Sequence, residues 1–568
     1  MKKLETKNRF VIKFANVNGS GSASANQLFA KGIFRSGVTV SPKNIFPSNI
    51  QGLPTWFEVR VSEKGYQGRR EKIDIMVAMN PQSYNQDVQE INSGGYILYD
   101  SSWKRDFGRS DINVIEIPLT KLCLKEFSTS KQRFLFKNIV YVGALSFLLG
   151  IEKNIYEVLI GEQFKGKEKL IEPNVKALNL GFNYAEENLK DKCAIKVEKS
   201  NKTDGMILTS GNDAAGLGCI YGGATVCTWY PITPSTSLAE AFTDYCEKLR
   251  IEDKSNKNKF AIIQAEDELA AIGMAIGANW NGARGFTATS GPGISLMSEF
   301  LGLAYFAEVP LVIFDIQRGG PSTGMPTRTQ QSDVLTCAYA SHGDTKHVLL
   351  IPSTPKECFD FAVQAFDLAD RLQTPIIVLS DLDLGMNDWT TPELQWDDSR
   401  EYDRGKVLYK EDLENLETWG RYIDVDGDGI PYRTYPGTHP EKGAYFTRGT
   451  SHDENAKYTE DGKVNAENLS RLLRKYQTAS ELVPRPEFKQ DSNSSSVGVI
   501  YFGSTDSSMK EALDLLREEG IILDAMRLRS FPFNLEVWEF IEDHDLLFIV
   551  EQNRDGQMRT LIMAEGGI

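Results

Sequence analysis

Three acidic residues, Glu266-Asp267-Glu268, stand at the start of an apolar stretch that runs to Gly277. Apolar residues occur all round this stretch, which predicts a buried helix with the acids in its first turn. The helix dipole stabilises a carboxylate there, and a desolvated carboxylate can share a proton with a ring nitrogen. Glu266 and Asp267 fit ordinary N-terminal capping. Glu268 begins the buried stretch and is the better candidate for proton chemistry.

An arginine, Arg318, follows the apolar strand candidate Val309–Ile316 and precedes a run of small residues from Gly319 to Gly324. A guanidinium beside glycines that let a ligand approach suits bidentate binding of a carboxylate. The alternative is a surface arginine on a flexible loop. The surrounding Gly, Ser and Thr residues favour the carboxylate site.

The turn Tyr230-Pro-Ile-Thr-Pro234 follows a β-branched, Gly-rich approach, and a helix is expected to start just after it. Two prolines fix φ at two of its positions, so the turn is stiff and the hydroxyl of Thr233 is held. A stiff turn at a helix N-terminus suits a small anion. Tyr230 and Thr233 are therefore candidate substrate-binding residues. The alternative is an ordinary strand-to-helix turn.

A glycine-rich loop, Asn18 to Ser24, lies between the strand candidate Arg9–Ala15 and a helix expected from about Ala25. Its glycines, Gly19 and Gly21, resemble the dinucleotide fingerprint GxGxxG, but Ser24 replaces the third glycine. The loop predicts either a phosphate cradle made by backbone N–H groups or a tight turn that only closes a βα unit.

The segment Asp424 to Gly429 contains Gly-Asp-Gly and precedes Asn455, a spacing that resembles the magnesium motif of thiamine enzymes and also a calcium loop. The thiamine motif would need a second asparagine at position 456, and the calcium loop would need a bidentate glutamate where Tyr435 stands. We therefore expect an Asp/Gly turn and no metal.

Composition narrows the class of protein. The formal net charge of −15 argues against a nucleic-acid partner. No apolar run approaches the roughly 20 residues that cross a bilayer. Polar residues follow Met1-Lys-Lys3, where a signal peptide would have its apolar core, so no signal peptide is expected. The seven cysteines show no CxxC spacing. They are interpreted as core residues in a reducing, cytoplasmic compartment, so any iron–sulfur centre is expected on another chain.

The candidate residues lie in a pattern of alternating strands and helices, which predicts an α/β protein with several parallel-sheet αβα domains. Three candidate loops leave the carboxyl ends of predicted strands, where such folds bind ligands. The strands of the first and central regions are predicted at Arg9–Ala15, Lys72–Ala78, Tyr96–Tyr99, Met206–Leu208, Ala224–Tyr230, Phe260–Gln264, Gly285–Thr289, Val309–Ile316, His347–Ile351 and Thr374–Ser380. Those of the last region are predicted at Gly498–Gly503, Ile521–Arg527 and Leu546–Glu551.

The alternation of strands and helices, and the places where it is interrupted by charged or polar stretches, predict the domain boundaries. We expect a first domain, a charged linker, a central domain, a polar insertion that covers the central domain, and a last βαβ domain. Their residues are 1–184, 185–204, 205–388, 389–490 and 491–568.

Seven motifs, in order along nearly the whole chain, resemble the alpha subunit of 2-oxoacid:ferredoxin oxidoreductases, most closely the 2-oxoglutarate type with a fused gamma domain. They are Asn49 to Thr55, Gly211 to Gly218, Tyr230 to Glu240, Glu266 to Ala271, Thr287 to Gly293, Gln317 to Gly324 and Asp424 to Pro431. The resemblance implies oxidative decarboxylation of a 2-oxoacid with coenzyme A, which gives acyl-CoA (succinyl-CoA from 2-oxoglutarate), carbon dioxide and reduced ferredoxin. It also implies a gamma-type first domain, a thiamine-pyrimidine-binding central domain and a transketolase C-terminal-like last domain.

The resemblance assigns roles and partners. Glu268 matches the glutamate that contacts the thiamine pyrimidine N1′, and Thr233 and Arg318 match residues that hold the oxoacid carboxylate. The gamma-type domain is expected near coenzyme A, through Gly19, Gly21 and the loop Ile50–Thr55. A separate beta subunit is expected to carry the diphosphate site of thiamine diphosphate, Mg²⁺ and a [4Fe–4S] cluster, in an (alpha-beta)₂ assembly that reduces ferredoxin.

Several alternatives stay open at this stage. The oxoacid could be pyruvate or a branched-chain 2-oxoacid. The chain could be a non-catalytic assembly subunit on the same fold, or half of a transketolase-like enzyme. Members of the family usually continue past the point where this chain ends, so truncation of the final domain is a further alternative.

Overall fold

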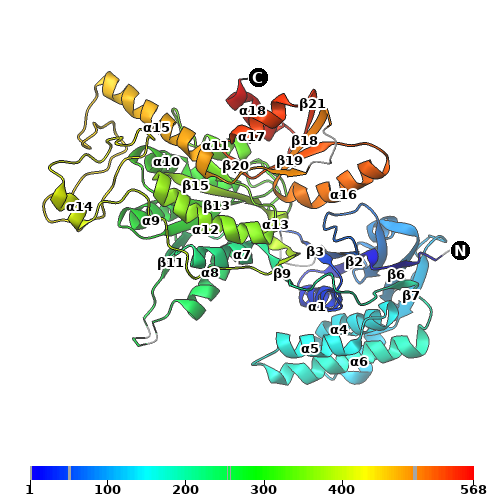
Figure 1. The fold of residues 1–568 in the computed structure, drawn as a ribbon. Helices are drawn as coiled ribbons and strands as arrows, with labels where there is room; N and C mark the ends of the chain where they lie inside the picture. The colour runs from blue at the N-terminus through cyan, green and yellow to red at the C-terminus, as the bar shows by residue number, and fades with distance from the viewer. Residues whose placement is uncertain (1–2, 49–52, 253, 256, 490–494, 568) are drawn as a thin grey trace. The chain divides into compact units, whose positions relative to one another are not determined.

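The structure is a computed structural model, which describes residues 3–48, 53–252, 254–255, 257–489 and 495–567. The chain forms two compact units (Figure 1). Unit 1 comprises Met1–Thr209 with Asn387–Glu393, and unit 2 comprises Ser210–Met386 with Leu394–Ile568.

Unit 1 contains a six-stranded sheet in the order β3-β4-β2-β5-β6-β7. The strands β2, β5, β6 and β7 are parallel, whereas β4 is antiparallel to both β2 and β3. The sheet is therefore mostly parallel, as predicted, and β4 is its antiparallel strand. The connection between β3 and β4 is too short to contain a crossover helix, so the two strands pair antiparallel. The sheet strands are β2 (Arg9–Val17), β3 (Val40–Ile45), β4 (Pro54–Ser62), β5 (Ile73–Ala78), β6 (Ile91–Asp100) and β7 (Asn113–Ile117).

Helices complete unit 1 and bury the main core against the sheet. Phe14 of β2 meets Phe29 of α1 edge-on, with ring centroids 5.3 Å apart. Two short strand pairs lie outside the main sheet: β1 (Thr6–Lys7) with β8 (Ile195–Lys196), and β9 (Met206–Ser210) with β16 (Asp388–Pro392). The helices are α1 (Ser22–Arg35), α2 (Tyr84–Gln89), α3 (Leu119–Glu126), α4 (Ser130–Leu149), α5 (Lys153–Gln163) and α6 (Ile171–Asn188).

The stretch 185–204, expected as a linker, is packed on unit 1. Helix α6 continues into it, and Ile195 and Val197 are buried in the core beside Cys193. These buried residues alternate with the more exposed Ala194 and Lys196, which is the period of a half-buried strand. The high content of lysine had concealed that period.

Unit 2 contains a seven-stranded sheet in the order β11-β10-β12-β13-β15-β14-β20. All its neighbouring strands are parallel except β20, which is antiparallel to β14. The strands predicted between Ala224 and Ser380 all lie in this sheet, whereas Met206–Leu208 belongs to β9. The sheet strands are β10 (Val226–Trp229), β11 (Ala261–Gln264), β12 (Gly285–Thr289), β13 (Leu311–Gln317), β14 (Val348–Leu350), β15 (Pro375–Asp381) and β20 (Ser530–Phe531).

Helices cover both faces of this sheet, as predicted for short buried strands. On one face, Phe286 of β12 contacts Phe242 of α8 and Phe366 of α12. On the other face, Ile272 of α9 and Ile294 of α10 share a core with Ile313 of β13. The helices of this central region are α7 (Gly211–Tyr221), α8 (Thr236–Leu249), α9 (Glu268–Trp280), α10 (Gly291–Ala307), α11 (Val334–Ala338), α12 (Pro355–Leu372) and α13 (Leu382–Met386).

The polar insertion is mostly irregular, with α14 (Lys410–Asn415) and a long helix, α15 (Gly462–Leu482), which the sequence pattern had not revealed. Buried ion pairs attach it to the central region. Arg471 and Lys475 of α15 both bond to Glu308, and Arg433 bonds to Asp370 of α12. The insertion is therefore fixed to the central region by buried charges.

The last region forms a four-stranded sheet in the order β17-β19-β18-β21, in which only β17 is antiparallel to its neighbour. The three strands predicted here are present, although β19 begins three residues later than expected. The elements are β17 (Glu487–Lys489), β18 (Val497–Phe502), β19 (Asp524–Leu528), β21 (Leu546–Val550), α16 (Asp506–Glu518), α17 (Leu535–Glu542) and α18 (Gln557–Gly566).

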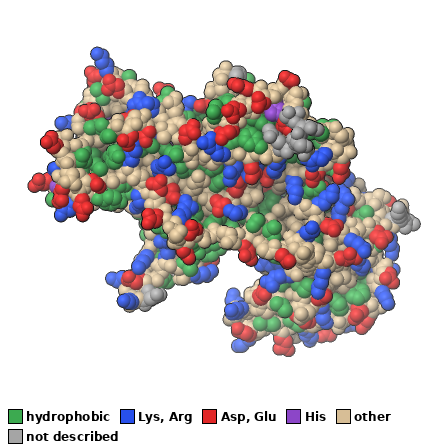
Figure 2. Space-filling view, viewed as in Figure 1, with side chains coloured by type: hydrophobic (Ala, Val, Ile, Leu, Met, Phe, Trp, Pro, Cys, Tyr) green, Lys and Arg blue, Asp and Glu red, His purple; other side chains and the backbone are tan. Residues whose placement is uncertain are grey.

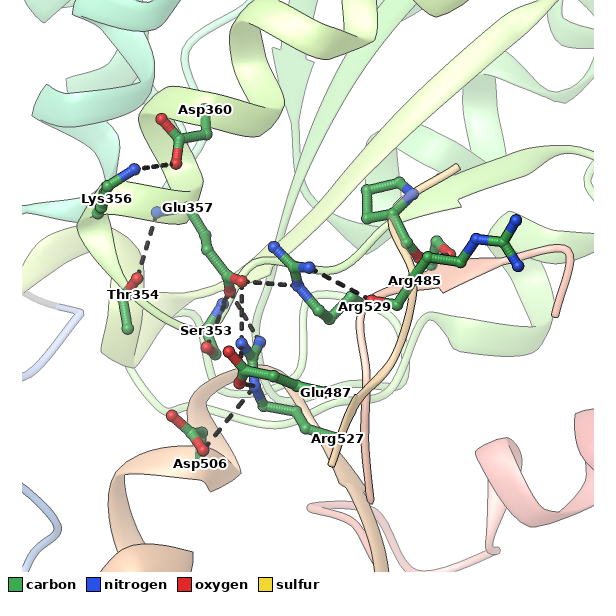
Figure 3. Close-up of polar contacts among 12 residues, drawn as sticks. Ser353, Thr354, Lys356, Glu357, Asp360, Arg485, Glu487, Asp506, Arg527 and Arg529 are labelled. Atoms are coloured by element: carbon green, nitrogen blue, oxygen red, sulfur yellow. Dashed lines mark hydrogen bonds and ion pairs between the residues drawn. The ribbon is translucent and has the colours of Figure 1, made fainter. Parts of the chain in front are cut away.

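An ion-pair network joins this last region to the central sheet (Figure 3). Glu357, in the first turn of α12, accepts two hydrogen bonds from Arg527 of β19 and one from Arg529. Burial acts to raise the pKa of Glu357, but the two guanidinium groups outweigh it and hold that pKa at about 2. The carboxylate therefore stays charged and fixes β19 against α12.

Acidic and basic side chains are interspersed over the face shown in Figure 2. All seven cysteines are buried and carry free thiols. Within the described ranges, no helix combines the length and the apolar character that a membrane crossing requires.

Candidate active site

The candidate site lies at the carboxyl ends of the parallel strands in unit 2. The three loops singled out from the sequence leave β10, β11 and β13 at the same edge of the sheet, because these strands run in one direction. Parallel pairing therefore brings together segments that are about 90 residues apart in the chain.

The turn after β10 is fixed by hydrogen bonds to side chains of α7 and α8. Asn212 of α7 donates its amide to the carbonyl of Pro234 at 2.9 Å, and the backbone N–H of Ile232 donates to the hydroxyl of Thr236 at 3.1 Å. Tyr230 is 36% exposed. Thr233 is half-buried between the two prolines. The turn therefore presents Tyr230 and Thr233 from a fixed backbone.

The three acidic residues after β11 differ in burial and in hydrogen bonding. Asp267 is the N-cap of α9 and accepts a hydrogen bond from the backbone N–H of Ala270 at 2.7 Å, and Glu266 is exposed. Glu268 begins the helix and is only 6% exposed. Its carboxylate makes no hydrogen bond to any residue that the structure describes.

Helix α9 is less buried than its all-round apolar sequence predicted. Leu269, next to Glu268, is 38% exposed. The helix packs on β10 and β12, one strand in from the edge strand β11, and its opposite side is left exposed. An apolar helix surface thus remains exposed at the site.

The first turn of α10 passes close to Glu268. A Cβ atom added to Gly293 would lie 1.9 Å from the hydroxyl of Thr289 and 2.9 Å from Cγ of Glu268. Only glycine fits at this position, so the turn can approach the buried carboxylate without a side chain between them.

Arg318 is 7% exposed, and its Nη1 donates to the carbonyl oxygen of Thr233 at 2.6 Å. Burial lowers the pKa of the Arg318 guanidinium, and the negative charges of Asp333 and Glu268 oppose that shift. Its Nε has no hydrogen-bond partner within the described residues. The structure therefore brings Thr233, Arg318 and Glu268 together, with donor capacity left on the guanidinium.

Asp333 is a candidate residue that the sequence reasoning missed. It lies at the start of α11, beyond the loop that follows Arg318, and its backbone N–H donates to Gln317 Oε1 at 3.0 Å. No local pattern marks it, because an aspartate before a short helix reads as an ordinary cap.

The glycine-rich loop belongs to unit 1 and forms a separate candidate site. Gly19 and Gly21 have positive φ values of 82° and 72°, and Gly21 caps α1. The helix begins at Ser22, earlier than expected, so Ser24 lies within it and is exposed. The close packing that a third glycine would permit is therefore not needed. Of the predicted loop Ile50–Thr55, residues 50–52 lie outside the described residues.

The acidic loop from Asp424 to Asp428 is a turn whose carboxylates are paired with cations. Lys406 bonds to Asp426 at 2.6 Å and to Asp428 at 2.9 Å, and Arg474 bonds to Asp424 at 3.0 Å. These pairs hold the insertion together.

The residues of the site fit the pyrimidine ring of thiamine. The carboxylate of Glu268 is buried, has no partner among the described residues, and lies at a helix start where a proton can be shared with a ring nitrogen. The Arg318 guanidinium, which donates to the Thr233 carbonyl, has the polarity that a carboxylate substrate requires.

Comparison with known proteins agrees with this geometry. Residues 217–472 match the family model described as pyruvate flavodoxin/ferredoxin oxidoreductase, thiamine diP-bdg, and residues 11–184 match pyruvate ferredoxin/flavodoxin oxidoreductase. The matched models define the class, a ferredoxin- or flavodoxin-linked oxidoreductase with a thiamine-diphosphate-binding domain.

Individual relatives narrow the family to which the chain can be assigned. Subunit alpha of 2-oxoacid:ferredoxin oxidoreductase 2 from Aeropyrum pernix is 30% identical, over 97% of this chain and 92% of the relative. The 2-oxoglutarate synthase subunit KorA from Methanothermobacter marburgensis is 34% identical, over 61% of this chain and 88% of the relative. The solved 2-oxoglutarate:ferredoxin oxidoreductase from Magnetococcus marinus, which has 2-oxoglutarate, coenzyme A and succinyl-CoA bound, superposes with a TM-score of 0.88 at 29% identity and covers 99% of this chain and 95% of that one. This chain belongs to the 2-oxoacid:ferredoxin oxidoreductase family, as an alpha subunit.

Proposed function

We propose that the chain provides the pyrimidine side of a thiamine-diphosphate site, and that the enzyme oxidises 2-oxoglutarate with coenzyme A to succinyl-CoA and carbon dioxide while reducing ferredoxin. The observation that carries the proposal is the meeting of the Arg318 guanidinium, the Thr233 turn and the buried Glu268 carboxylate. The relatives named for 2-oxoglutarate support the choice of substrate.

Each of the three residues has one task in this proposal. Thiamine diphosphate, when bound, supplies a nucleophilic carbon that adds to the oxoacid and accepts the electrons left when carbon dioxide departs. Glu268 shares a proton with the pyrimidine N1′ and so promotes the reactive form of the cofactor. Arg318 and the hydroxyl of Thr233 bind the oxoacid carboxylate, and Tyr230 borders the same turn.

A partner subunit completes the site in this proposal. Exposed apolar side chains lie on the elements around Glu268, with Leu269 38%, Leu296 56% and Ile263 43% exposed. An apolar surface beside a candidate active site suits a protein interface. We assign this surface to a beta subunit that carries the diphosphate site, Mg²⁺ and a [4Fe–4S] cluster, in an (alpha-beta)₂ assembly. The naming of the relatives as alpha subunits supports a multi-subunit enzyme.

Coenzyme A is assigned to unit 1. The N-terminus of α1, capped by Gly21, offers backbone N–H groups, and the buried hydroxyl of Ser20 has no hydrogen-bond partner among the described residues. These are the groups that a phosphate accepts from. The seven free thiols are consistent with a reducing, cytoplasmic location.

The proposal is tested with the chain co-expressed with its beta partner. Purified complex is supplied with coenzyme A, ferredoxin and one of 2-oxoglutarate, pyruvate or a branched-chain 2-oxoacid, and acyl-CoA and reduced ferredoxin are measured. We expect the highest kcat/KM with 2-oxoglutarate. A preference for another oxoacid would correct the substrate, and a complex inactive with all three would favour an assembly subunit.

Arg318→Ala is expected to raise the KM for the oxoacid by about 10- to 100-fold, because a charged hydrogen-bond partner of the substrate is lost. The KM for coenzyme A should not change, since that site is assigned elsewhere. Steady-state kinetics of the co-expressed complex measure both constants. Arg371→Ala, at a residue whose side chain is 50% exposed, is the control. An oxoacid KM equal to that of the control would count against the role of Arg318.

A further inference from the structure

The loop between Arg318 and helix α11 is anchored in the last region of unit 2 by a buried glutamine, Gln331, which is 1% exposed. Its backbone N–H donates to the carbonyl oxygen of Gln552 at 3.0 Å, and the backbone N–H of Gln552 donates back to Gln331 Oε1 at 3.0 Å. Gln331 Nε2 donates to the carbonyl oxygen of Phe502 at 3.0 Å. The proposed reaction gives this residue no task.

Gln331 reaches the carboxyl ends of β18 and β21, which are adjacent parallel strands. Phe502 is the last residue of β18, and Gln552 follows the end of β21 by two residues. Folds of this kind commonly bind ligands at that edge of the sheet. Here a side chain from a distant part of the same chain lies there. A Cβ atom added to Gly503 would lie 2.9 Å from Gln331 Nε2, so a glycine is needed for the amide to approach.

The two residues that follow the anchored position hold the backbone at the end of β13. The Ser332 hydroxyl donates to the carbonyl oxygen of Arg318 at 2.9 Å, and the N–H of Asp333 donates to Gln317 Oε1 at 3.0 Å. From α18, Gln557 Nε2 donates to the carbonyl oxygen of Ser332 at 2.7 Å. Hydrogen bonds therefore run from the last region to the backbone of Arg318.

The position of the Arg318 guanidinium depends on this backbone. Arg318 is the first residue after β13, and its Nη1 donates to the carbonyl oxygen of Thr233 at 2.6 Å. The chain then continues through the glycines Gly319 and Gly320, which restrict the backbone little. The bond from Ser332 supplies the restriction that the glycines do not. A carboxylate is bound well only by donors that are already held in place.

We infer that Gln331 is a positioning residue, which anchors the loop in the last region so that Ser332 holds the backbone of Arg318 and its guanidinium against the Thr233 turn. The inference rests on the proposed function, in which Arg318 binds the carboxylate of the 2-oxoacid. Gln331 itself does not touch the substrate. The last region thereby supports the site from a distance.

The kinetic test uses Gln331→Met in the complex with the beta subunit, because methionine keeps the length of the side chain and removes its amide. We expect the KM for 2-oxoglutarate to rise by about 10-fold while kcat stays within about 3-fold of wild type. Such a split indicates lost substrate binding. The KM for coenzyme A should not change.

The matched control is Gln373→Met, which separates positioning from a merely structural role. Gln373 is fully buried just before the amino end of β15, the edge of the sheet opposite Arg318, and it donates to the carbonyl oxygen of Pro431 at 2.5 Å. This variant should lower the thermal unfolding temperature and leave the oxoacid KM unchanged. An oxoacid KM for Gln331→Met within about 2-fold of the control would overturn the inference. So would a fall in kcat at constant KM.

A second variant reaches the same loop from the last region and leaves the sequence of the loop intact. Gln557→Met removes the donor to the Ser332 carbonyl oxygen and the acceptor for the N–H of Leu335, which lies 3.2 Å from Gln557 Oε1. We expect the oxoacid KM to rise by about 3- to 10-fold. If Gln331→Met fails to fold, this variant decides, and an oxoacid KM within about 2-fold of wild type would contradict the inference.

Hydrogen–deuterium exchange gives a readout that does not depend on activity. In Gln331→Met and Gln557→Met, amides within 317–333 should exchange at least about 3-fold faster than in wild type, whereas Gln373→Met should not change them. Exchange equal to wild type in both loop variants would refute the anchoring. If the wild-type complex oxidises no 2-oxoacid, the proposed function fails, and the exchange rates still decide whether Gln331 anchors the loop.

Discussion

Glu268→Gln is expected to leave the chain folded and assembled with its partner, and to lower kcat at least about 100-fold. The reason is chemical, because glutamine has the same shape as glutamate but cannot take up and return a proton. Glu268 is buried at the first position of α9, so no solvent molecule can easily replace its carboxylate. The loss should therefore appear in turnover and not in assembly.

The measurement is single-turnover and steady-state kinetics of the co-expressed complex with 2-oxoglutarate, with thermal unfolding as a check on the fold. Glu266→Gln is a matched control, because it lies two residues earlier, is exposed and does not cap the helix. Full activity in the Glu268 variant would remove the central claim of the proposed mechanism. Equal losses in the two variants would indicate a general electrostatic effect.

Glu308→Gln should destabilise unit 2 by about 3–5 kcal/mol, because removing one partner of a buried ion pair leaves uncompensated charge in the interior. Glu308 follows α10 with its side chain fully buried, and it accepts hydrogen bonds from Arg471 at 2.5 Å and from Lys475 at 2.8 Å. The variant would leave both cations of α15 without their anion. The attachment of the insertion should weaken first.

The midpoint of urea unfolding measures this loss, and limited proteolysis within 394–482 locates it. Glu299→Gln, within the helix α10 that precedes Glu308 and with a side chain 77% exposed, is the control and should change the midpoint little. A midpoint in Glu308→Gln equal to that of the control would contradict the prediction.

The same carboxylate makes a prediction about pH. Burial acts to raise the pKa of Glu308, but Arg471 and Lys475 outweigh it and hold that pKa well below the ordinary value of 4.5. Because the folded-state pKa is depressed, the stabilisation is present above about pH 4.5 and is lost as pH falls toward the folded-state value. The difference between wild type and Glu308→Gln should therefore shrink on acidification.

Much of the central region could be predicted because its strands are short, apolar and separated by helical patterns. The strand Gly285–Thr289 was predicted with its observed bounds, and the loops after β10, β11 and β13 followed from strand order and direction. Asp267 was predicted as a cap and Glu268 as the buried acid, because the apolar stretch of the helix begins at Glu268.

Other features had no local signal. The antiparallel pairing of β3 with β4, the burial of Ile195, and the long helix α15 depend on contacts with distant residues. Asp333 appears in the sequence as a simple helix cap. Its carboxylate lies against the first turn of α10 only because β13, α10 and α11 meet at one point.

By itself the sequence determined the α/β class, the family resemblance, and the residue types able to bind a carboxylate and share a proton, because periodicity and motif spacing are local properties of the chain. Only the tertiary structure decided that the Arg318 guanidinium reaches the Thr233 carbonyl, and that the side chain of Glu268 is buried beside the first turn of α10. Distances between side chains on different strands depend on pairing and packing across the whole sheet, and no local pattern encodes them.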